Sequence, residues 1–141
     1  MEHIRHSVTI AAPAEKVYEA ITTQTGLANW WTRETIAQPQ TDFINEFRFG
    51  DHPPKKMRVT SLQPNQSVAW HCEEAEEEWV NTNFSFNLET KEDKTVLRFT
   101  HTDWREATEY YEVCNYHWAY FLHSLKKLCE TGTGHPFPDM D

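Results

Sequence analysis

The period of the hydrophobic pattern changes from that of strands to that of a helix near residue 105, and this change limits the folds that the chain can adopt. Between residues 43 and 100, apolar and polar residues alternate in short runs, which is typical of strands with one buried face. Residues 106–130 contain no Gly or Pro, and their apolar side chains recur every three or four positions, which predicts a long helix. The helical face comprises Tyr110, Val113, Cys114, His117, Phe121, Leu125 and Leu128. Because an apolar sheet face must be covered, this helix is expected to lie across the sheet.

The N-terminal region also begins with alternation and then becomes helical. Residues 4–10 alternate between apolar and polar side chains and predict a first strand. Pro13 suits the first turn of a helix, which Gly26 is expected to end. Residues 27–31 then predict a second, short helix.

The predicted order is therefore strand, helix, short helix, five or six strands and a long helix. Short turns near residues 50–54, 63–65 and 92–94 indicate an antiparallel meander. We expect a single α+β domain over residues 1–141, in which a curved antiparallel sheet of six to seven strands wraps around the C-terminal helix. Two short helices separate strands 1 and 2, and the tail 131–141 is expected to be extended. Such a sheet and helix enclose a volume that either side chains or a ligand can fill.

The charge balance argues against nucleic acid and membrane surfaces as partners. The net charge is −9 with His neutral, and no basic stripe offsets it. The longest acidic run covers residues 73–78 and is interpreted as a solvated turn between strands. The alternative is a docking surface for a basic protein partner.

Cysteine usage and the N-terminus favour a cytoplasmic protein. The chain has three cysteines, Cys72, Cys114 and Cys129, with no CxxC pair, which argues against a disulfide framework. The first residues lack the apolar core of a signal peptide, and no apolar stretch is long enough to span a membrane.

Motifs for metal, phosphate or nucleophilic chemistry are missing from the sequence. There is no HExxH, no Cys pair, no Gly-rich loop and no Gly-x-Ser-x-Gly elbow, so we assign no metal, cofactor or catalytic residue. Cys114 and His117 are three apart on the predicted helix and could form a thiol–imidazole pair. A buried apolar Cys beside a hydrogen-bonded His is the favoured interpretation.

Aromatic residues make up 13% of the chain and supply the candidate binding site. Apolar walls with a few polar groups are characteristic of ligand pockets. Phe84, Phe86, Leu88, Leu97 and Phe99 form one consistent apolar strand face. The full candidate ligand-binding set is Trp31, Phe47, Trp70, Phe84, Phe86, Phe99, His101, His117, Tyr120 and Phe121.

Four segments resemble the START-like superfamily, also called SRPBCC or Bet v-type. They are IAAPAEKVYEAI at residues 10–21, LANWWT at 27–32, FTHTDW at 99–104 and YHWAYFLHSLKKL at 116–128. Within the superfamily, the chain is most similar to the domain family of activator of heat shock protein 90 ATPase homologues. The resemblance implies the helix-grip fold, and it leaves the activity open because the superfamily contains carriers, cyclases and co-chaperone domains.

Three functions follow as hypotheses, in order of preference. The first is a non-enzymatic carrier, sequestering protein or sensor of a small apolar or aromatic ligand. The second is a cofactor-independent hydrolase, cyclase or isomerase, in which imidazoles such as those of His101 and His117 polarise a carbonyl or shuttle a proton. The third is a chaperone-cofactor-like module in the stress response that binds a protein through its acidic surface. Either a monomer or a homodimer is compatible with each.

Overall fold

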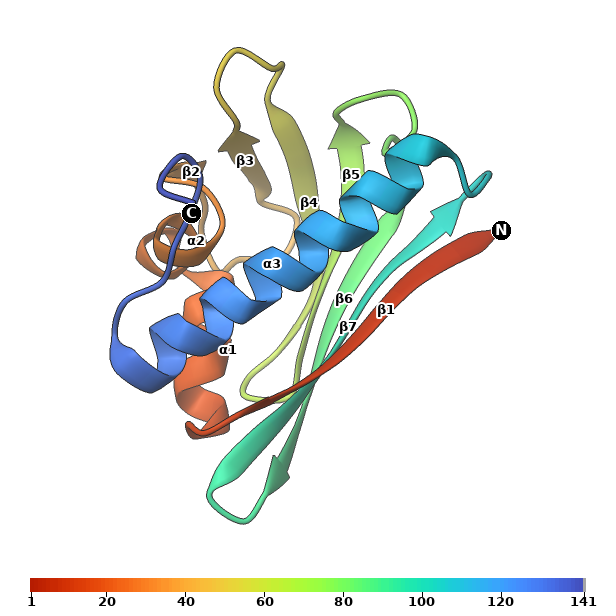
Figure 1. The fold of residues 1–141 in the computed structure, drawn as a ribbon. Helices are drawn as coiled ribbons and strands as arrows, with labels where there is room; N and C mark the ends of the chain where they lie inside the picture. The colour runs from red at the N-terminus through yellow and green to blue at the C-terminus, as the bar shows by residue number, and fades with distance from the viewer. Residues whose placement is uncertain (141) are drawn as a thin grey trace.

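The computed structural model describes residues 1–140 and contains one antiparallel sheet and three helices (Figure 1). In chain order the elements are β1 (Glu2–Ile10), α1 (Ala14–Thr22), α2 (Gln24–Trp30), β2 (Glu34–Ile36), β3 (Ile44–Arg48), β4 (Lys55–Gln63), β5 (Ser67–Glu74), β6 (Asn83–Lys91), β7 (Lys94–Trp104) and α3 (Glu109–Thr131).

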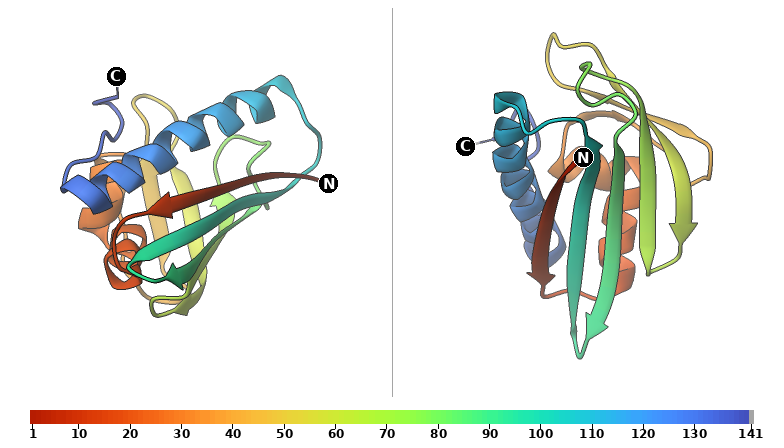
Figure 2. Two further views of the ribbon diagram at one scale, coloured as in Figure 1. Left: turned by 60° about the horizontal axis from the view of Figure 1, so that its bottom comes forward. Right: turned by 90° about the vertical axis from the view of Figure 1, so that its right-hand side faces the viewer.

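The seven strands form one sheet in the order β1-β7-β6-β5-β4-β3-β2, and every neighbouring pair is antiparallel. The sheet curves, and α3 crosses its concave side (Figure 2). This confirms the α+β helix-grip fold with two short helices between the first two strands. The three-residue strand β2 was not predicted, because three residues are too few for a period to be recognised.

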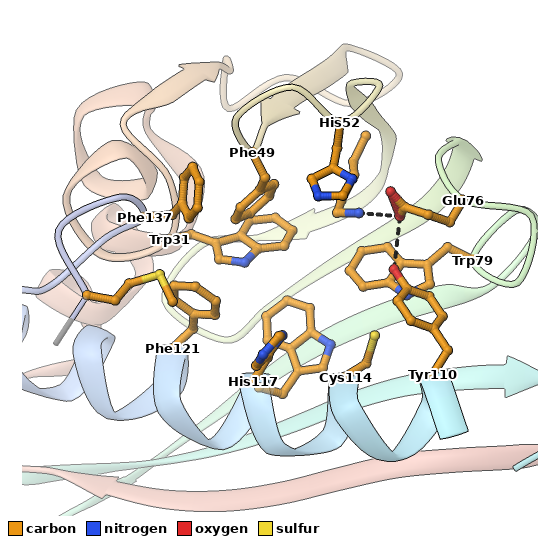
Figure 3. Close-up of a pocket in the computed structure, with 13 residues that line it drawn as sticks. Trp31, Phe49, His52, Glu76, Trp79, Tyr110, Cys114, His117, Phe121 and Phe137 are labelled. Atoms are coloured by element: carbon orange, nitrogen blue, oxygen red, sulfur yellow. Dashed lines mark hydrogen bonds and ion pairs between the residues drawn. The ribbon is translucent and has the colours of Figure 1, made fainter. Parts of the chain in front are cut away.

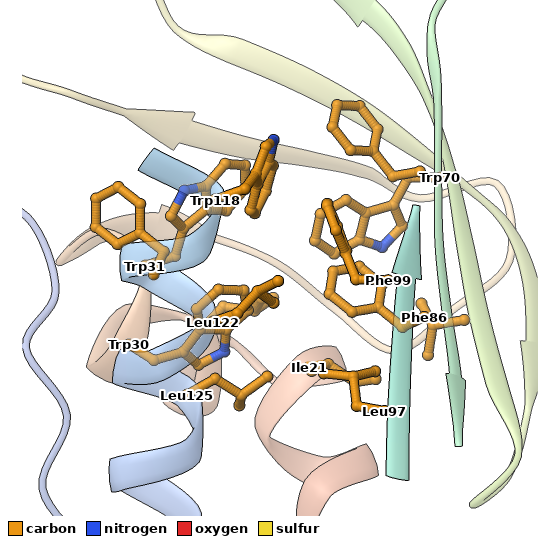
Figure 4. Packing of buried hydrophobic residues seen from close by; sticks show 14 of the residues in the cluster. Ile21, Trp30, Trp31, Trp70, Phe86, Leu97, Phe99, Trp118, Leu122 and Leu125 are labelled. Carbon is orange, nitrogen blue, oxygen red and sulfur yellow. The ribbon is translucent and has the colours of Figure 1, made fainter. Parts of the chain in front are cut away.

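The apolar faces of the strands lie in register, as their alternation predicted. Phe86 lies opposite Phe99 and Leu88 opposite Leu97 on neighbouring strands β6 and β7. Trp70 of β5 lies opposite Phe84 of β6, so the same face continues across the sheet. Full burial of each such side chain stabilises the fold by about 1.5–3 kcal/mol. Figure 4 shows Trp70, Phe86 and Phe99 packed between the strands and the helices.

The sequence predicts that the first short helix ends at Gly26, but the structure divides the two short helices at Thr23. Thr23 has an extended backbone that ends α1, and its hydroxyl accepts a hydrogen bond of 3.0 Å from the Gly26 N–H in the first turn of α2. Gly26 lies inside α2 because α2 packs closely on α1. A Cβ atom at Gly26 would lie 2.6 Å from the Cα of Ala20. Trp30 strengthens this contact, since its indole N–H donates to the Ala20 carbonyl at 2.8 Å.

Helix α3 begins and ends at clear signals. The Thr108 hydroxyl accepts from the Tyr111 N–H at 3.2 Å, and Gly132 ends the helix with a φ of 89°. The buried face differs from the predicted one, because Val113 and His117 are exposed. The buried side chains of α3 are Cys114, Trp118, Phe121, Leu122, Ser124, Leu125 and Cys129. The face is thus shifted toward Trp118, Leu122 and Cys129. In residues 1–140, no helix is long and apolar enough to cross a membrane.

The tail after α3 folds back beside the end of α2. The Phe137 N–H donates to the Trp31 carbonyl at 2.9 Å, and the Arg33 N–H donates to the Phe137 carbonyl at 3.0 Å. Gly134 permits this path, because a Cβ atom there would clash with the Asn29 carbonyl oxygen and lie 3.1 Å from the carbonyl oxygen of Ser124. The tail therefore lies at the edge of the space between α3 and the sheet.

Candidate ligand-binding cavity

A cavity of about 250 Å³ lies between the N-terminal half of α3 and the strands (Figure 3). Its walls come from four parts of the chain: the end of α2, the β3–β4 connection, the β5–β6 connection and α3. The tail adds a fifth. The lining residues are Trp31, Phe49, His52, Lys55, Glu76, Trp79, Tyr110, Cys114, His117, Trp118, Phe121, Phe137 and Met140.

The walls are mostly aromatic rings that hold one another in place. Trp118 lies at the centre, with its ring centroid 5.0 Å from that of Trp31 and 6.2 Å from that of Trp79. The Trp79 and Trp118 planes are within 16° of parallel. Phe49 packs on Trp31 and also on Phe137 of the tail, at 5.4 and 5.5 Å. Such rings present wide, flat apolar surfaces that suit an aromatic ligand.

One corner of the cavity is polar. The Lys55 ammonium forms an ion pair and hydrogen bond with Oε2 of Glu76, and the Tyr110 hydroxyl donates to the same oxygen at 3.0 Å. The ammonium also lies over the Trp79 ring, 4.4 Å from its centroid, a cation–π contact. Lys55 is 8% exposed, which is unusual for a lysine.

The corner is charged but balanced. Burial opposes the charged form of Glu76, yet the hydrogen bond and charge of Lys55, with the Tyr110 hydroxyl, hold the pKa of this carboxyl below its ordinary value. Burial raises the pKa of Tyr110, as does the negative charge of Glu76, so the phenol stays protonated. At neutral pH the corner therefore holds one positive and one negative charge and a neutral hydroxyl.

The cavity thiol is not poised for nucleophilic attack. Burial raises the pKa of Cys114, so it is held as a neutral thiol. His117 is exposed, and among the described residues no hydrogen bond joins it to Cys114. Burial also raises the pKa of Cys72 to about 12 and that of Cys129 to about 11. Within residues 1–140, no three His, Cys, Asp or Glu side chains are grouped so as to hold a metal ion.

His101 lies behind the wall and connects two of its tryptophans. The Trp118 indole N–H donates to Nδ1 of His101 at 3.2 Å, so the ring carries its proton on Nε2 and donates to the Thr82 hydroxyl at 2.9 Å. That hydroxyl donates to the Trp79 carbonyl at 2.6 Å. Burial lowers the pKa of His101 well below its ordinary value, and the Lys55 charge adds to this. The imidazole is therefore neutral and positions Trp79 and Trp118.

Of the residues predicted to bind a ligand, Trp31, His117 and Phe121 line the cavity. Six others do not, and lie in the packed core at 0–1% exposure: Phe47, Trp70, Phe84, Phe86, Phe99 and His101. Trp31, Trp118 and the α1–α2 pair pack onto the sheet and cover these six, so they lie behind the cavity wall, and their part in ligand binding stays a prediction. Tyr120 is half-buried and contacts Phe121, and it is not part of the wall.

Several lining residues were not found from the sequence. Glu76 belongs to the acidic run that was interpreted as solvated, and while Glu73, Glu74 and Glu77 are exposed, Glu76 turns into the cavity. Trp79 follows this run directly and was the available signal that the turn packs against the core, since a large apolar ring in an acidic turn needs other side chains to cover it. Nothing in the sequence around Lys55 indicated that its side chain would line a cavity. Phe137 and Met140 belong to a tail that lacks any period.

Comparisons with known proteins agree with this fold. Residues 11–130 match the family model described as "Activator of Hsp90 ATPase homolog 1-like protein". The Aha1 dimer of Colwellia psychrerythraea is 41% identical, with a TM-score of 0.88 over 95% of this chain and 100% of that one. No curated protein matches the chain.

More distant structures share the fold. MLL2253 from Mesorhizobium loti has 18% identity and a TM-score of 0.81 over 90% of this chain and 96% of that one. DynU16, a putative protein in the dynemicin biosynthetic locus, has 20% identity and a TM-score of 0.80 over 95% of this chain and 49% of that one. With the family model covering most of its length, the chain belongs to the family of Activator of Hsp90 ATPase homolog 1-like proteins.

Proposed function

We propose that the protein binds a small aromatic ligand in the cavity between α3 and the sheet. The observation that carries this proposal is that about 250 Å³ stays open beside a core that is otherwise filled by side chains. Protein interiors are normally close-packed, and an open apolar space forfeits contact energy that a ligand restores.

The size of the space favours a ligand of one or two rings. Pockets for drug-sized ligands span about 300–1,000 Å³, and a dry cavity of about 150 Å³ is large enough for benzene. This cavity lies between those sizes. The neutral thiol of Cys114 and the imidazole of His101, which lies behind the wall, favour ligand binding over catalytic turnover.

Tryptophan fluorescence provides a direct test, because Trp31, Trp79 and Trp118 all line the cavity. We expect naphthalene to quench the emission saturably. Cys114→Phe should abolish this quenching or weaken the affinity at least about tenfold, because the added ring occupies the cavity. Val113→Phe is the matched control, since it adds a ring on the exposed side of the same helix. Equal affinity in the wild type and Cys114→Phe would contradict the proposal.

Native mass spectrometry of the freshly purified protein complements the titration. A reproducible adduct of a few hundred daltons, absent from Cys114→Phe, would identify the ligand class directly. An adduct of equal abundance in both proteins would place the bound molecule outside the cavity.

We also propose that the chain forms a homodimer, as its relative from Colwellia psychrerythraea does. The 41% identity over that whole chain supports a shared association. Light scattering coupled to gel filtration should give a mass near twice 16.7 kDa, and a mass near 16.7 kDa at micromolar concentration would contradict this. A protein partner at the exposed glutamates of residues 73–78 stays a prediction.

A further inference from the structure

The Lys55 ammonium has more hydrogen-bond donors than partners. An ammonium carries three N–H bonds, and one of them is directed at Glu76. Within residues 1–140 the other two meet no acceptor, and one side of the group is covered by the Trp79 ring at 4.4 Å. Because the side chain is 10% exposed, water has little access to satisfy these donors. A buried ammonium in this condition is a site for a ligand oxygen.

Acceptors next to Lys55 are also incompletely used. The Glu76 carboxylate offers about four lone-pair positions. Lys55 and the Tyr110 hydroxyl both use Oε2, which leaves acceptor capacity on the carboxylate. The Tyr110 oxygen keeps its own lone pairs after donating. The corner therefore presents free donors and free acceptors within one small region of the cavity wall.

The apolar and polar parts of the cavity are continuous. Trp79 borders both, since its ring stacks parallel to Trp118 and lies beneath the Lys55 ammonium. Figure 3 shows Glu76 and Tyr110 at one end of the lining and Phe121 and Phe137 at the other. A flat ligand that lies along Trp118 thus reaches Lys55 and Glu76 with its end.

We propose that the ligand is a neutral aromatic compound with a hydroxyl group, whose oxygen accepts from Lys55 and whose proton is donated to Glu76. This inference rests on the proposed binding function and specifies its ligand class. A hydroxyl group matches the corner because it is both donor and acceptor. An ether or ketone oxygen satisfies Lys55 alone, and a hydrocarbon satisfies neither group.

The charge of the corner excludes a carboxylate ligand. Lys55 is already neutralised by Glu76, so an incoming anion gains little from the ammonium and is repelled by the carboxylate. The desolvation of the anion adds a further cost in this mostly apolar space. The corner therefore selects a neutral polar group over an anionic one.

Four probes of the same ring system test the proposal: naphthalene, 2-methoxynaphthalene, 2-naphthol and 2-naphthoate. In the wild type we expect 2-naphthol to bind about tenfold more tightly than naphthalene, because a hydrogen bond to a charged group contributes at least this much. The methoxy compound should fall between them, and 2-naphthoate should bind more weakly than 2-naphthol. Isothermal titration and tryptophan quenching measure these affinities.

The double variant Lys55→Met/Glu76→Gln removes both charges without leaving either unpaired. It should lose the preference for 2-naphthol over naphthalene. Lys126→Met/Glu130→Gln is the matched control, because it removes an ion pair on α3 outside the cavity and should keep the preference.

The outcomes separate the two proposals. Equal affinities for 2-naphthol and naphthalene in the wild type would overturn the hydroxyl assignment and leave the binding function standing. A preference that survives in the double variant, or tighter binding of 2-naphthoate, would also overturn it. Absence of saturable binding for all four probes would overturn the binding function itself. The wild-type comparison needs no variant, so the test holds even if the double variant does not fold.

Discussion

Two neighbouring regions beneath α3 both contain aromatic rings, yet side chains fill one of them and the other contains a cavity. In the solid region, between α1, α2 and strands β6 and β7, Trp30, Phe86 and Leu97 are 0% exposed. In the open region, Phe49 and Phe137 are half-buried around the cavity. Aromatic content alone therefore does not decide where a ligand pocket forms.

The difference comes from what closes each region. The solid region is closed by α1 and α2, which approach closely at Ala20 and Gly26 and drive large side chains into the sheet. The region with the cavity is bordered instead by the β5–β6 connection and the C-terminal tail, which run along its edge. The start of β4 and the β5–β6 connection also bring the ion pair of Lys55 and Glu76 to this edge. Its charged groups need polar partners, so apolar side chains alone cannot fill the space beside them.

The largest expected effect is loss of a core ring. Phe86→Ala should lower the free energy of unfolding by about 3–5 kcal/mol, because a cavity replaces a fully buried ring. Phe49→Ala should lower it by about 1–2 kcal/mol, since one side of that ring already faces open space. Chemical denaturation measures both. Similar losses for the two variants would erase the distinction between the regions.

Displacing the tail should have the next largest effect. Gly134→Ala places a Cβ against the Asn29 carbonyl, so the tail must shift away from α2. We expect a loss of about 1–3 kcal/mol in unfolding free energy, typical of overpacking. Naphthalene should also dissociate faster, because Phe137 and Met140 leave the cavity. Gly132→Ala is a useful contrast: it strains the positive φ at the end of α3, but its added Cβ meets no atom of residues 1–140 within 4 Å. Unchanged dissociation in Gly134→Ala would exclude the tail as a barrier.

Breaking the ion pair of the polar corner should destabilise the protein moderately. Lys55→Met leaves the Glu76 carboxylate partly buried without its cation, and we expect a loss of about 1–2 kcal/mol, since Glu76 retains some solvent. Adding Glu76→Gln should recover most of this loss. A double variant less stable than Lys55→Met would show that the pair contributes through packing rather than charge.

The smallest expected effect is a pH dependence of the stability that originates at His101, behind the cavity wall. The folded state disfavours protonation of His101, whereas the unfolded chain takes up the proton near pH 6.5. Stability should therefore fall as the pH drops below about 6.5, with a slope of up to about 1.4 kcal/mol per pH unit from this residue. His101→Asn should flatten the slope between pH 6.5 and 5, while His123→Asn, on the exposed side of α3, should not. An unchanged slope in His101→Asn would assign the dependence to other groups.

Much of the fold was predictable, because each strand and helix carries its own period. The face formed by Phe84, Phe86 and Phe99 was identified correctly, since alternation places those rings on one side of neighbouring strands. Gly26 was misinterpreted because its role is a close contact with Ala20, which lies outside its own helix. The rotation of the α3 face was missed for a similar reason, since the buried Trp118 is held by a hydrogen bond to His101 of β7, a partner outside its own helix.

The candidate site was predictable only in part. Trp31, His117 and Phe121 were identified because they lie on elements with a clear period. Lys55 and Glu76 are separated by 21 residues and meet where the start of β4 lies beside the end of β5, so neither indicates the other in the sequence. Glu76 was further hidden by its exposed neighbours in the acidic run.

The sequence by itself determined the order of strands and helices and the side of the sheet that faces α3. These features depend on the direction of each side chain relative to its own backbone, which the local pattern encodes. The tertiary structure alone decided which aromatic rings were covered and which were left to line a cavity, and it brought Lys55, Glu76 and Tyr110 together. Those outcomes depend on where a turn and a tail without periodicity meet the sheet, and local side-chain patterns carry no information about such distant contacts.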